Sequence, residues 1–304
     1  MDGPVAAPER YSLSGHWGQR PSLVVFGTVV LALVTGYLWG FASPHIPSMK
    51  LSWLGGCFLG CGVGYCCYWL ARQTKCRNCG IVHVTAWVSG ILCAYTAAVG
   101  FAMEVLAITG NRPPFSAVAL AFDPVLLKDA LVAIASSGCF RSGSRPMGSG
   151  ELWFHWGFEA LAIAVGIGAV ASYQIRRQIF CEECYQWLDI KANSKCFPLP
   201  ADAADVTRLK TGDLSVLDGK SPSMLKFPYC RLDYSVCKKC GNTGAYRLAL
   251  VKGAAASEES ALTPLMRLTP EAAVVLGQLL AREKESAEPT PEKTESVSPP
   301  ASPE

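Results

Sequence analysis

Two short segments of this chain share one pattern: an apolar run reaches a tyrosine, arginines follow, and a Cys-x-x-Cys pair closes the segment. The first reads YWLARQTKCRNC (68–79) and the second reads YQIRRQIFCEEC (173–184). Aligned on the tyrosines, the segments are identical at Tyr68/Tyr173, Arg72/Arg177, Gln73/Gln178, Cys76/Cys181 and Cys79/Cys184. Each copy is typical of the end of a membrane helix followed by a basic turn and two metal ligands.

The composition also indicates a membrane protein. Of the 304 residues, 50% are hydrophobic and 17% are charged, and the mean hydropathy is +0.25. The formal net charge of +3 is too small to indicate a nucleic-acid surface, so nucleic acid is not an expected partner. The sequence lacks a phosphate-binding glycine loop, an HExxH helix and a nucleophile elbow. These absences favour a non-enzymatic role, although they leave enzymatic activity open.

Four runs with few or no charges are long enough to cross a bilayer at about 1.5 Å of rise per residue. They cover residues 21–42, 51–71, 81–106 and 152–175. We therefore predict an α-helical membrane bundle of four spans over 21–175, with an outer loop over 107–151. Within the second span, Gly56, Gly60 and Gly64 form a stripe of small residues that lets two membrane helices approach closely.

The outer loop contains one apolar segment that is too short and too charged to cross a membrane. Asp123 precedes Pro124, an arrangement typical of a helix N-cap followed by proline in the first turn. The helix predicted over 124–137 also contains Lys128 and Asp129. We expect this helix to be interfacial or re-entrant.

An even number of spans puts both ends of the chain, and both Cys-x-x-Cys turns, on one side of the bilayer. Lys and Arg near the ends of the spans are more numerous on that side, which marks it as cytoplasmic. Thiols also stay reduced in the cytoplasm, as metal-binding thiolates must. We therefore predict a protein of the plasma (inner) membrane with cytoplasmic N- and C-termini.

The rest of the chain divides by composition. Residues 1–20 form a polar segment without a fold signal, and 176–254 are predicted to form a small cytoplasmic β domain. Residues 255–285 are predicted to be a linker and a capped helix. The last residues, 286–304, are rich in Pro, Glu, Ser and Thr, a composition that cannot bury a core, so this tail is predicted to be disordered.

Two Cys-x-x-Cys pairs in the β domain carry the strongest chemical signal. Each pair forms a knuckle that directs two sulfurs at one ion, and two knuckles complete a tetrahedral zinc site. The predicted ligands are Cys181, Cys184, Cys237 and Cys240, and the predicted cofactor is zinc. Unmetallated thiols or a redox pair are the alternatives.

The order of knuckle, strand, loop, knuckle and strand resembles a zinc ribbon (rubredoxin-like) over roughly residues 179–252. The resemblance implies a small β domain of the kind that often binds nucleic acids or proteins. The chain departs from the usual pattern because a long insertion, 185–236, separates the two knuckles.

Cys76 and Cys79 are also predicted metal ligands, but their turn, 72–80, is too short to form a domain by itself. One interpretation is that they complete a site with the first knuckle. A second is a separate site with Cys196 and Cys230, or with another chain. A third is a dithiol that cycles with a disulfide, since neighbouring positive charges lower thiol pKa values.

Ionisable residues inside the predicted spans, or directly before one, form a second group of candidates. Glu151, His155 and Glu159 are spaced by four and share one helix face, and Glu104 lies in the third span. Glu151 is expected to be an exposed acid at the helix start. Glu104, His155 and Glu159 either act as a proton or ion path or join helices by hydrogen bonds.

These observations predict an integral membrane protein that presents a cytoplasmic zinc-binding module as a docking or regulatory scaffold. Its expected partners are the lipid bilayer and a cytoplasmic protein, and a homo-oligomer is compatible with the sequence. One alternative is a membrane thiol redox protein that uses its Cys-x-x-Cys pairs. Another is a small transporter or channel whose path passes the intramembrane Glu and His residues.

Overall fold

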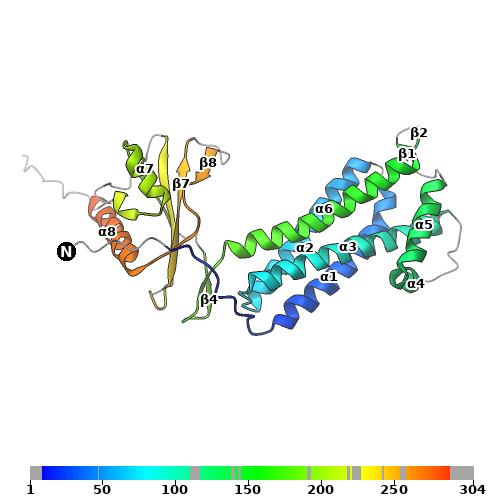
Figure 1. Cartoon of the computed structure of the whole chain (residues 1–304), viewed down its shortest axis with the longest axis horizontal. Coiled ribbons are helices and arrows are strands. Elements are labelled where there is room, and N and C mark those ends of the chain that lie inside the picture. Colours follow the sequence, from blue (N-terminus) through cyan, green and yellow to red (C-terminus); the bar gives the residue numbers. More distant parts are fainter. Residues whose placement is uncertain are drawn as a thin grey trace, which may run out of the picture. The chain divides into compact units, whose positions relative to one another are not determined.

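The computed structural model describes residues 9–46, 48–109, 117–137, 141–142, 145–189, 193–217, 220, 227–241, 243–253 and 258–287. The chain divides into two compact units (Figure 1). The helical unit comprises Leu13–Phe180 and Tyr185–Trp187, and the C-terminal unit comprises Met1–Ser12, Cys181–Cys184 and Leu188–Glu304.

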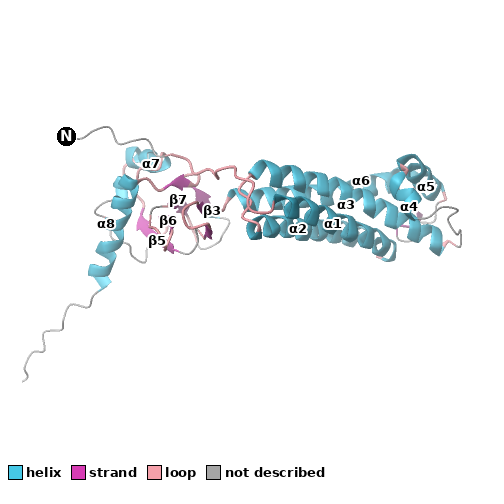
Figure 2. Cartoon of the chain, turned by 90° about the horizontal axis from the view of Figure 1, so that it is seen from below, coloured by secondary structure: helices cyan, strands magenta, loops and turns pink. Residues whose placement is uncertain are grey.

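The helical unit is built on four long helices that run side by side (Figure 2). They are α1 (Pro21–Ala42), α2 (Met49–Gln73), α3 (Cys79–Ile108) and α6 (Ser149–Arg176). All four are long and apolar enough to cross a membrane, as the hydropathy of the sequence predicts. Large apolar side chains such as Phe26 and Phe58 are exposed on their outer faces, which suits a lipid environment.

Glycines bring α2 and α6 into close contact. A Cβ atom added to Gly60 would lie 2.6 Å from the Ile163 carbonyl oxygen, and one on Gly64 would lie 2.7 Å from that of Ile167. No larger side chain fits such a gap, because real Cβ contacts are longer. The predicted glycine stripe is therefore a helix-packing surface.

Shorter elements connect the long helices. η1 (Ser43–His45) follows α1, whereas α4 (Ala117–Phe122), α5 (Pro124–Ser136), β1 (Arg141–Ser142) and β2 (Arg145–Pro146) lie between α3 and α6. The Asp123 carboxylate accepts hydrogen bonds from the backbone N–H groups of Val125 and Leu126, both at 3.0 Å. The predicted N-cap is confirmed, and Leu127 and Leu131 of α5 pack against side chains of α3.

The C-terminal unit contains a five-stranded antiparallel sheet. Its strand order is β5-β6-β7-β8, with β9 also paired to β7. The strands are β5 (Asn193–Pro198), β6 (Tyr229–Val236), β7 (Gly244–Val251), β8 (Glu259–Ala261) and β9 (Met266–Arg267). A separate pair of short strands, β3 (Ile179–Cys181) and β4 (Gln186–Leu188), flanks the first knuckle, and most of its residues belong to the helical unit.

One face of the sheet carries the core of this unit. Leu232, Tyr234, Tyr246 and Leu248 alternate along β6 and β7 and are buried, as expected for one face of a pleated sheet. Helix α7 (Ala203–Lys210), η3 (Leu214–Leu217) and α8 (Pro270–Ala287) supply the other side chains of this cluster, including Leu209, Leu214, Leu217, Leu276 and Leu279.

The core therefore extends further along the chain than the sequence indicates. A linker and a capped helix are predicted over 255–285, yet β8 and β9 belong to the sheet and α8 contributes to the core. Strands of two or three residues are too short to give an alternating hydrophobic pattern. The predicted disordered tail, 286–304, lies outside the described residues except for the last two positions of α8.

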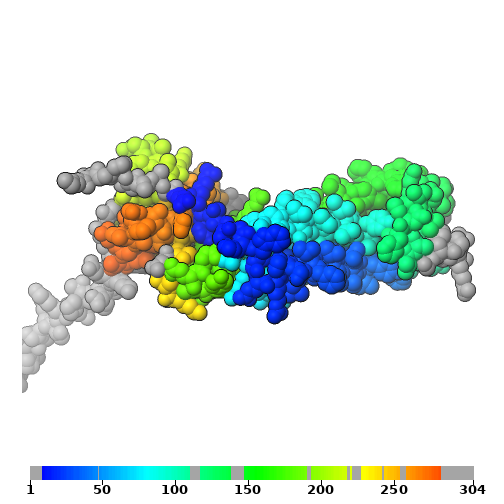
Figure 3. Space-filling view, turned by 60° about the horizontal axis from the view of Figure 1, so that its bottom comes forward, coloured from blue at the N-terminus to red at the C-terminus, as the bar shows by residue number. Residues whose placement is uncertain are grey.

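Residues 9–12 of the N-terminal segment also belong to the C-terminal unit, and the blue atoms at the start of the described chain lie against it in Figure 3. Arg10 forms an antiparallel bridge with Met266. The Tyr11 N–H donates to the Leu265 carbonyl at 2.9 Å, and the Arg267 N–H donates to the Glu9 carbonyl at 2.8 Å. A segment without a fold signal thus extends the pairing along β9.

Candidate metal centre

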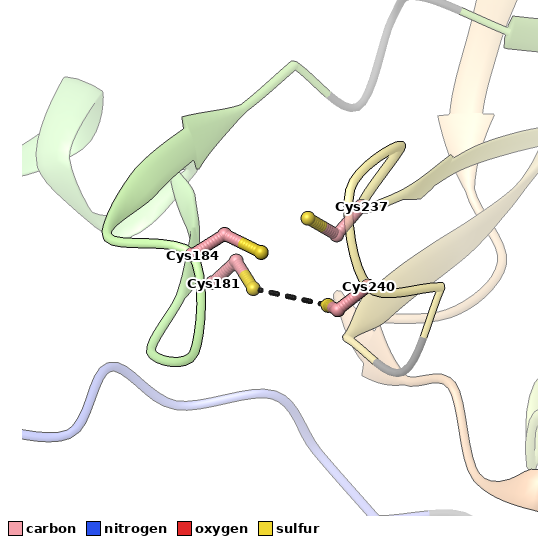
Figure 4. Close-up of side chains that lie close together, drawn as sticks. All are labelled: Cys181, Cys184, Cys237 and Cys240. Carbon is pink, nitrogen blue, oxygen red and sulfur yellow. Dashed lines mark hydrogen bonds between the residues drawn. The ribbon is translucent and has the colours of Figure 1, made fainter.

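Four cysteine sulfurs converge in the C-terminal unit (Figure 4). Cys181 ends β3 and Cys184 lies in the turn before β4, whereas Cys237 and Cys240 lie in the turn between β6 and β7. The four Sγ atoms lie within 4.8 Å of one another, and those of Cys181 and Cys240 are 3.5 Å apart. The predicted knuckles are brought together although 52 intervening positions, 185–236, separate them.

Both knuckles end in the same backbone conformation. Gly241, directly after Cys240, has φ +72°, and Tyr185, directly after Cys184, has φ +52°. Glycine adopts this left-handed region at little cost, whereas other residues do so rarely. The second knuckle is closed by hydrogen bonds of 2.8 Å from the Cys237 N–H to the Thr243 carbonyl and from the Gly241 N–H to the Cys237 carbonyl.

The sulfurs differ in how readily they ionise without a cation. Burial opposes ionisation of Cys237, but the backbone N–H groups of Cys240 and Lys239 outweigh it and lower its pKa to about 6. Desolvation and the neighbouring sulfurs raise the pKa of Cys184 to about 12. Four thiolates at this spacing repel one another, so full ionisation needs a bound cation.

The donor set suits a metal ion. In a tetrahedral site with Zn–S bonds of about 2.3 Å, neighbouring sulfurs are about 3.8 Å apart, which matches the spacing of this group. Among the residues that the structure describes, these four cysteines are the one group of three or more His, Cys, Asp or Glu that could hold a metal. Four thiolates would bind the ion through sulfur alone, a ligand set that favours zinc or iron over magnesium or calcium.

Cys76 and Cys79, the other predicted ligands, are not in this group. Cys76 lies in the turn between α2 and α3 and is fully buried in an apolar cluster that includes Cys67. Burial raises the pKa of the Cys76 thiol. Their role as ligands stays a prediction.

Cys196 and Cys230, suggested as further ligands, do not face each other. The register pairs Cys230 with Phe197 and Cys196 with Arg231. Because successive side chains of a strand point to opposite faces, the two cysteines lie on different faces of the sheet.

The ionisable candidates predicted within the spans are Glu104, His155 and Glu159. Glu104 lies in the C-terminal half of α3, and His155 and Glu159 lie in the N-terminal half of α6. Oε1 of Glu159 accepts hydrogen bonds from Trp39 Nε1 at 2.7 Å and from Ser52 Oγ at 2.8 Å. Nε2 of His155 lies 3.9 Å from Oε2 of Glu159, so this predicted pair is brought together.

Glu104 has a different partner. Its Oε1 lies 2.8 Å from Nε2 of His45. Nδ1 of His83, in the first turns of α3, lies 2.6 Å from Ser172 Oγ. The sequence analysis did not identify Trp39 and Ser52 as partners of Glu159, or His45 as the partner of Glu104. The one available indication was that each carries a polar group within or beside an apolar run.

Comparisons of this chain with protein-family models, with curated proteins and with solved structures find no match.

Proposed function

We propose that this chain is an integral membrane protein that binds one zinc ion in its C-terminal unit and uses that unit as a cytoplasmic docking or regulatory scaffold. The observation that carries the proposal is the convergence of four cysteine sulfurs within 4.8 Å. In this proposal Cys181, Cys184, Cys237 and Cys240 hold the zinc, and its charge stabilises the four thiolates.

The closed ligand set favours a structural role for the metal. Catalytic zinc sites keep one position for water or substrate, whereas structural sites use four protein ligands. Zinc held by two knuckles would fix the hairpin of β6 and β7 to the first knuckle. It would thereby stabilise a surface that a protein partner can recognise.

Two features support placing both ends of the chain on one side of the membrane. The four helices that are long and apolar enough to span give an even number of crossings. Residues 9–11 also pair with residues 265–267, and such pairing requires both segments in the same compartment. The excess of Lys and Arg at that end of the spans favours the cytoplasmic side of the plasma membrane.

The burial of Cys76 weighs against a redox dithiol formed by Cys76 and Cys79. A nucleophilic thiol is usually accessible and has a lowered pKa. Cys76 is fully buried, and this burial raises its pKa.

Metal analysis of the full-length protein in detergent tests the proposal. We expect one zinc per chain in the parent, loss of that zinc in Cys240→Ser, and retention in Cys196→Ser, a cysteine of the same sheet outside the group. Absence of metal together with a reversible disulfide among the four cysteines would instead support the redox alternative.

The scaffold role and the orientation need separate tests. A reporter that is active only in the cytoplasm, fused after Glu304, should be active. A cross-linked complex formed in cells should be lost in Cys240→Ser and kept in Cys196→Ser. A complex that survives loss of the zinc would contradict docking through the metal-stabilised unit.

A further inference from the structure

The helical unit contains a cavity of about 260 Å³ bordered by α1, α3, α5 and α6. Four aromatic side chains line it: Trp39, Phe101, Trp153 and Trp156. Most other lining residues are alanine or glycine, whose small size leaves the space between the helices. Trp153 is 40% exposed, so the cavity has an aromatic mouth on the outer surface of this unit.

Glu159 is the one ionisable residue among those that line this cavity. Its Oε1 accepts hydrogen bonds from Trp39 Nε1 and Ser52 Oγ, which fix the position of the carboxyl group. Within the described residues, the one basic group that lies within 4 Å of the Glu159 carboxyl group is His155, whose Nε2 is 3.9 Å from Oε2. No lysine or arginine lines the cavity. A buried carboxylate is costly unless a cation compensates its charge.

A second, smaller cavity of about 70 Å³ shares Ser43, Phe101 and Trp156 with the first. Its polar lining residues include Ser48, Ser52 and His155. Trp156 Nε1 and His155 Nδ1 are buried and have no hydrogen-bond partner in the described part of the chain. The volume accommodates about two water molecules. The smaller cavity, next to His155, is therefore the polar one, and the larger cavity, lined by aromatic residues, is the apolar one.

We propose that the larger cavity binds a small organic cation: an amine or quaternary ammonium with an apolar body. The ammonium group would lie near Glu159, where the carboxylate supplies the opposite charge. The faces of Trp and Phe rings attract cations by their quadrupole, most strongly where water is excluded. The alanines and the aromatic mouth would hold the apolar body, and such a ligand can reach Trp153 from the membrane interface. This site is independent of the metal centre.

Calorimetric titration of the full-length protein in lipid nanodiscs tests the site, with empty nanodiscs as the partitioning control. The probe is phenyltrimethylammonium, and its uncharged isostere is tert-butylbenzene. We expect saturable binding of the cation and at least tenfold weaker binding of the isostere. Glu159→Gln keeps the shape and an acceptor for Trp39 and Ser52 but removes the charge, so it should weaken cation binding about thirtyfold. Glu104→Gln, an acid that does not line the cavity, should leave the affinity unchanged.

A cavity-filling variant keeps the test decisive if Glu159→Gln does not fold. Ala97→Leu retains the carboxylate and occupies the space, so it should abolish saturable binding. The inference is overturned if the parent shows no saturable cation binding at millimolar concentration. Equal affinity for the cation and its isostere, or an equal loss in Glu104→Gln and Glu159→Gln, overturns it as well.

Discussion

The guanidinium carbon of Arg77 lies 4.5 Å from the centroid of the Phe180 ring. The same guanidinium carbon lies 5.4 Å from the centroid of the Tyr185 ring. The Arg77 side chain is buried. Nearby, Trp187 Nε1 donates to the Arg72 carbonyl at 2.8 Å. Arg77 belongs to the first copy of the repeated segment and Phe180 to the second, so the two copies meet in the helical unit. These contacts hold the residues that flank the first knuckle in sequence.

Replacing Arg77 with methionine should release this segment. Arg77→Met replaces the charged side chain with an apolar one of similar length. It removes the cation–π contacts, which are worth about 2 kcal/mol in a desolvated site. We expect faster amide hydrogen exchange over residues 179–187. Arg176→Met, an exposed arginine of the second copy, is the control and should leave this exchange unchanged. Equal exchange in the parent and Arg77→Met would show that the ring contacts do not order the segment.

A larger side chain at Gly60 should separate α2 from α6. Gly60→Val introduces a Cβ that would lie 2.6 Å from the Ile163 carbonyl oxygen, whereas Gly62 of the same helix has nothing within 4 Å of an added Cβ. Overpacking of this kind costs about 1–3 kcal/mol. Thermal unfolding in detergent should therefore show a lower Tm for Gly60→Val than for Gly62→Val. A matched fall in Tm for both variants would point to helix propensity rather than to packing.

The positions of the four long helices follow from local hydropathy, and the Asp123 cap and the Cys-x-x-Cys knuckles follow from short spacings. These features are readable because neighbouring residues determine them. The partners of Glu159 are different, since Ser52 and Trp39 lie 107 and 120 positions away. No local pattern predicts such a contact, because the packing of whole helices produces it.

The C-terminal unit should lose stability in acid through Asp233. Its carboxylate accepts hydrogen bonds from Arg247 at 2.7 Å, from Ser194 at 2.6 Å and from Arg231 at 2.9 Å. Burial opposes ionisation, but these donors outweigh it and lower the pKa of Asp233 below 3.8. A carboxyl whose pKa is lower in the folded state stabilises that state above its unfolded pKa of about 3.9. This contribution is lost as pH falls through the folded value.

Asp233→Asn measures this contribution. At pH 7 it should lower the free energy of opening of strands β6 and β7 by about 3 kcal/mol, because two arginines lose a buried partner. The difference from the parent should shrink as the pH falls below 4. Hydrogen exchange of peptides over 229–251 provides the measurement. Asp205→Asn, which removes an exposed pair with Arg208, should change the same peptides by less than about 0.5 kcal/mol.

Metal affinity should increase with pH. Cysteine binds metal as thiolate, and in the metal-free protein the pKa of Cys184 is raised to about 12. Binding near neutral pH therefore releases protons, and the affinity should rise about tenfold per pH unit for each proton released. Competition with a chelator of known affinity at pH 6.5 and 7.5 gives the dependence. An affinity that is the same at both values would mean that the sulfurs are already ionised or do not bind the metal.

The metal site and the N-terminal pairing show where short-range patterns reach their limit. The types and spacing of the cysteines indicate the site before any fold is known. The sequence does not indicate that Arg10 forms a β-bridge with Met266. Polar residues such as Glu9 and Arg10 lack the alternating hydrophobic pattern by which a strand is predicted. The pairing depends on backbone hydrogen bonds, which any residue except proline can donate.

This pairing also constrains how the protein is made. Residues 9–11 leave the ribosome before any of the four apolar helices, whereas their partners near β9 follow roughly 250 residues later, a delay of about 13 to 50 s at usual translation rates. During that interval the N-terminal segment has no strand to pair with. Completion of the sheet region is therefore one of the last events of synthesis, and a bulky fusion before Glu9 would interfere with assembly at a stage when all four helices are already made.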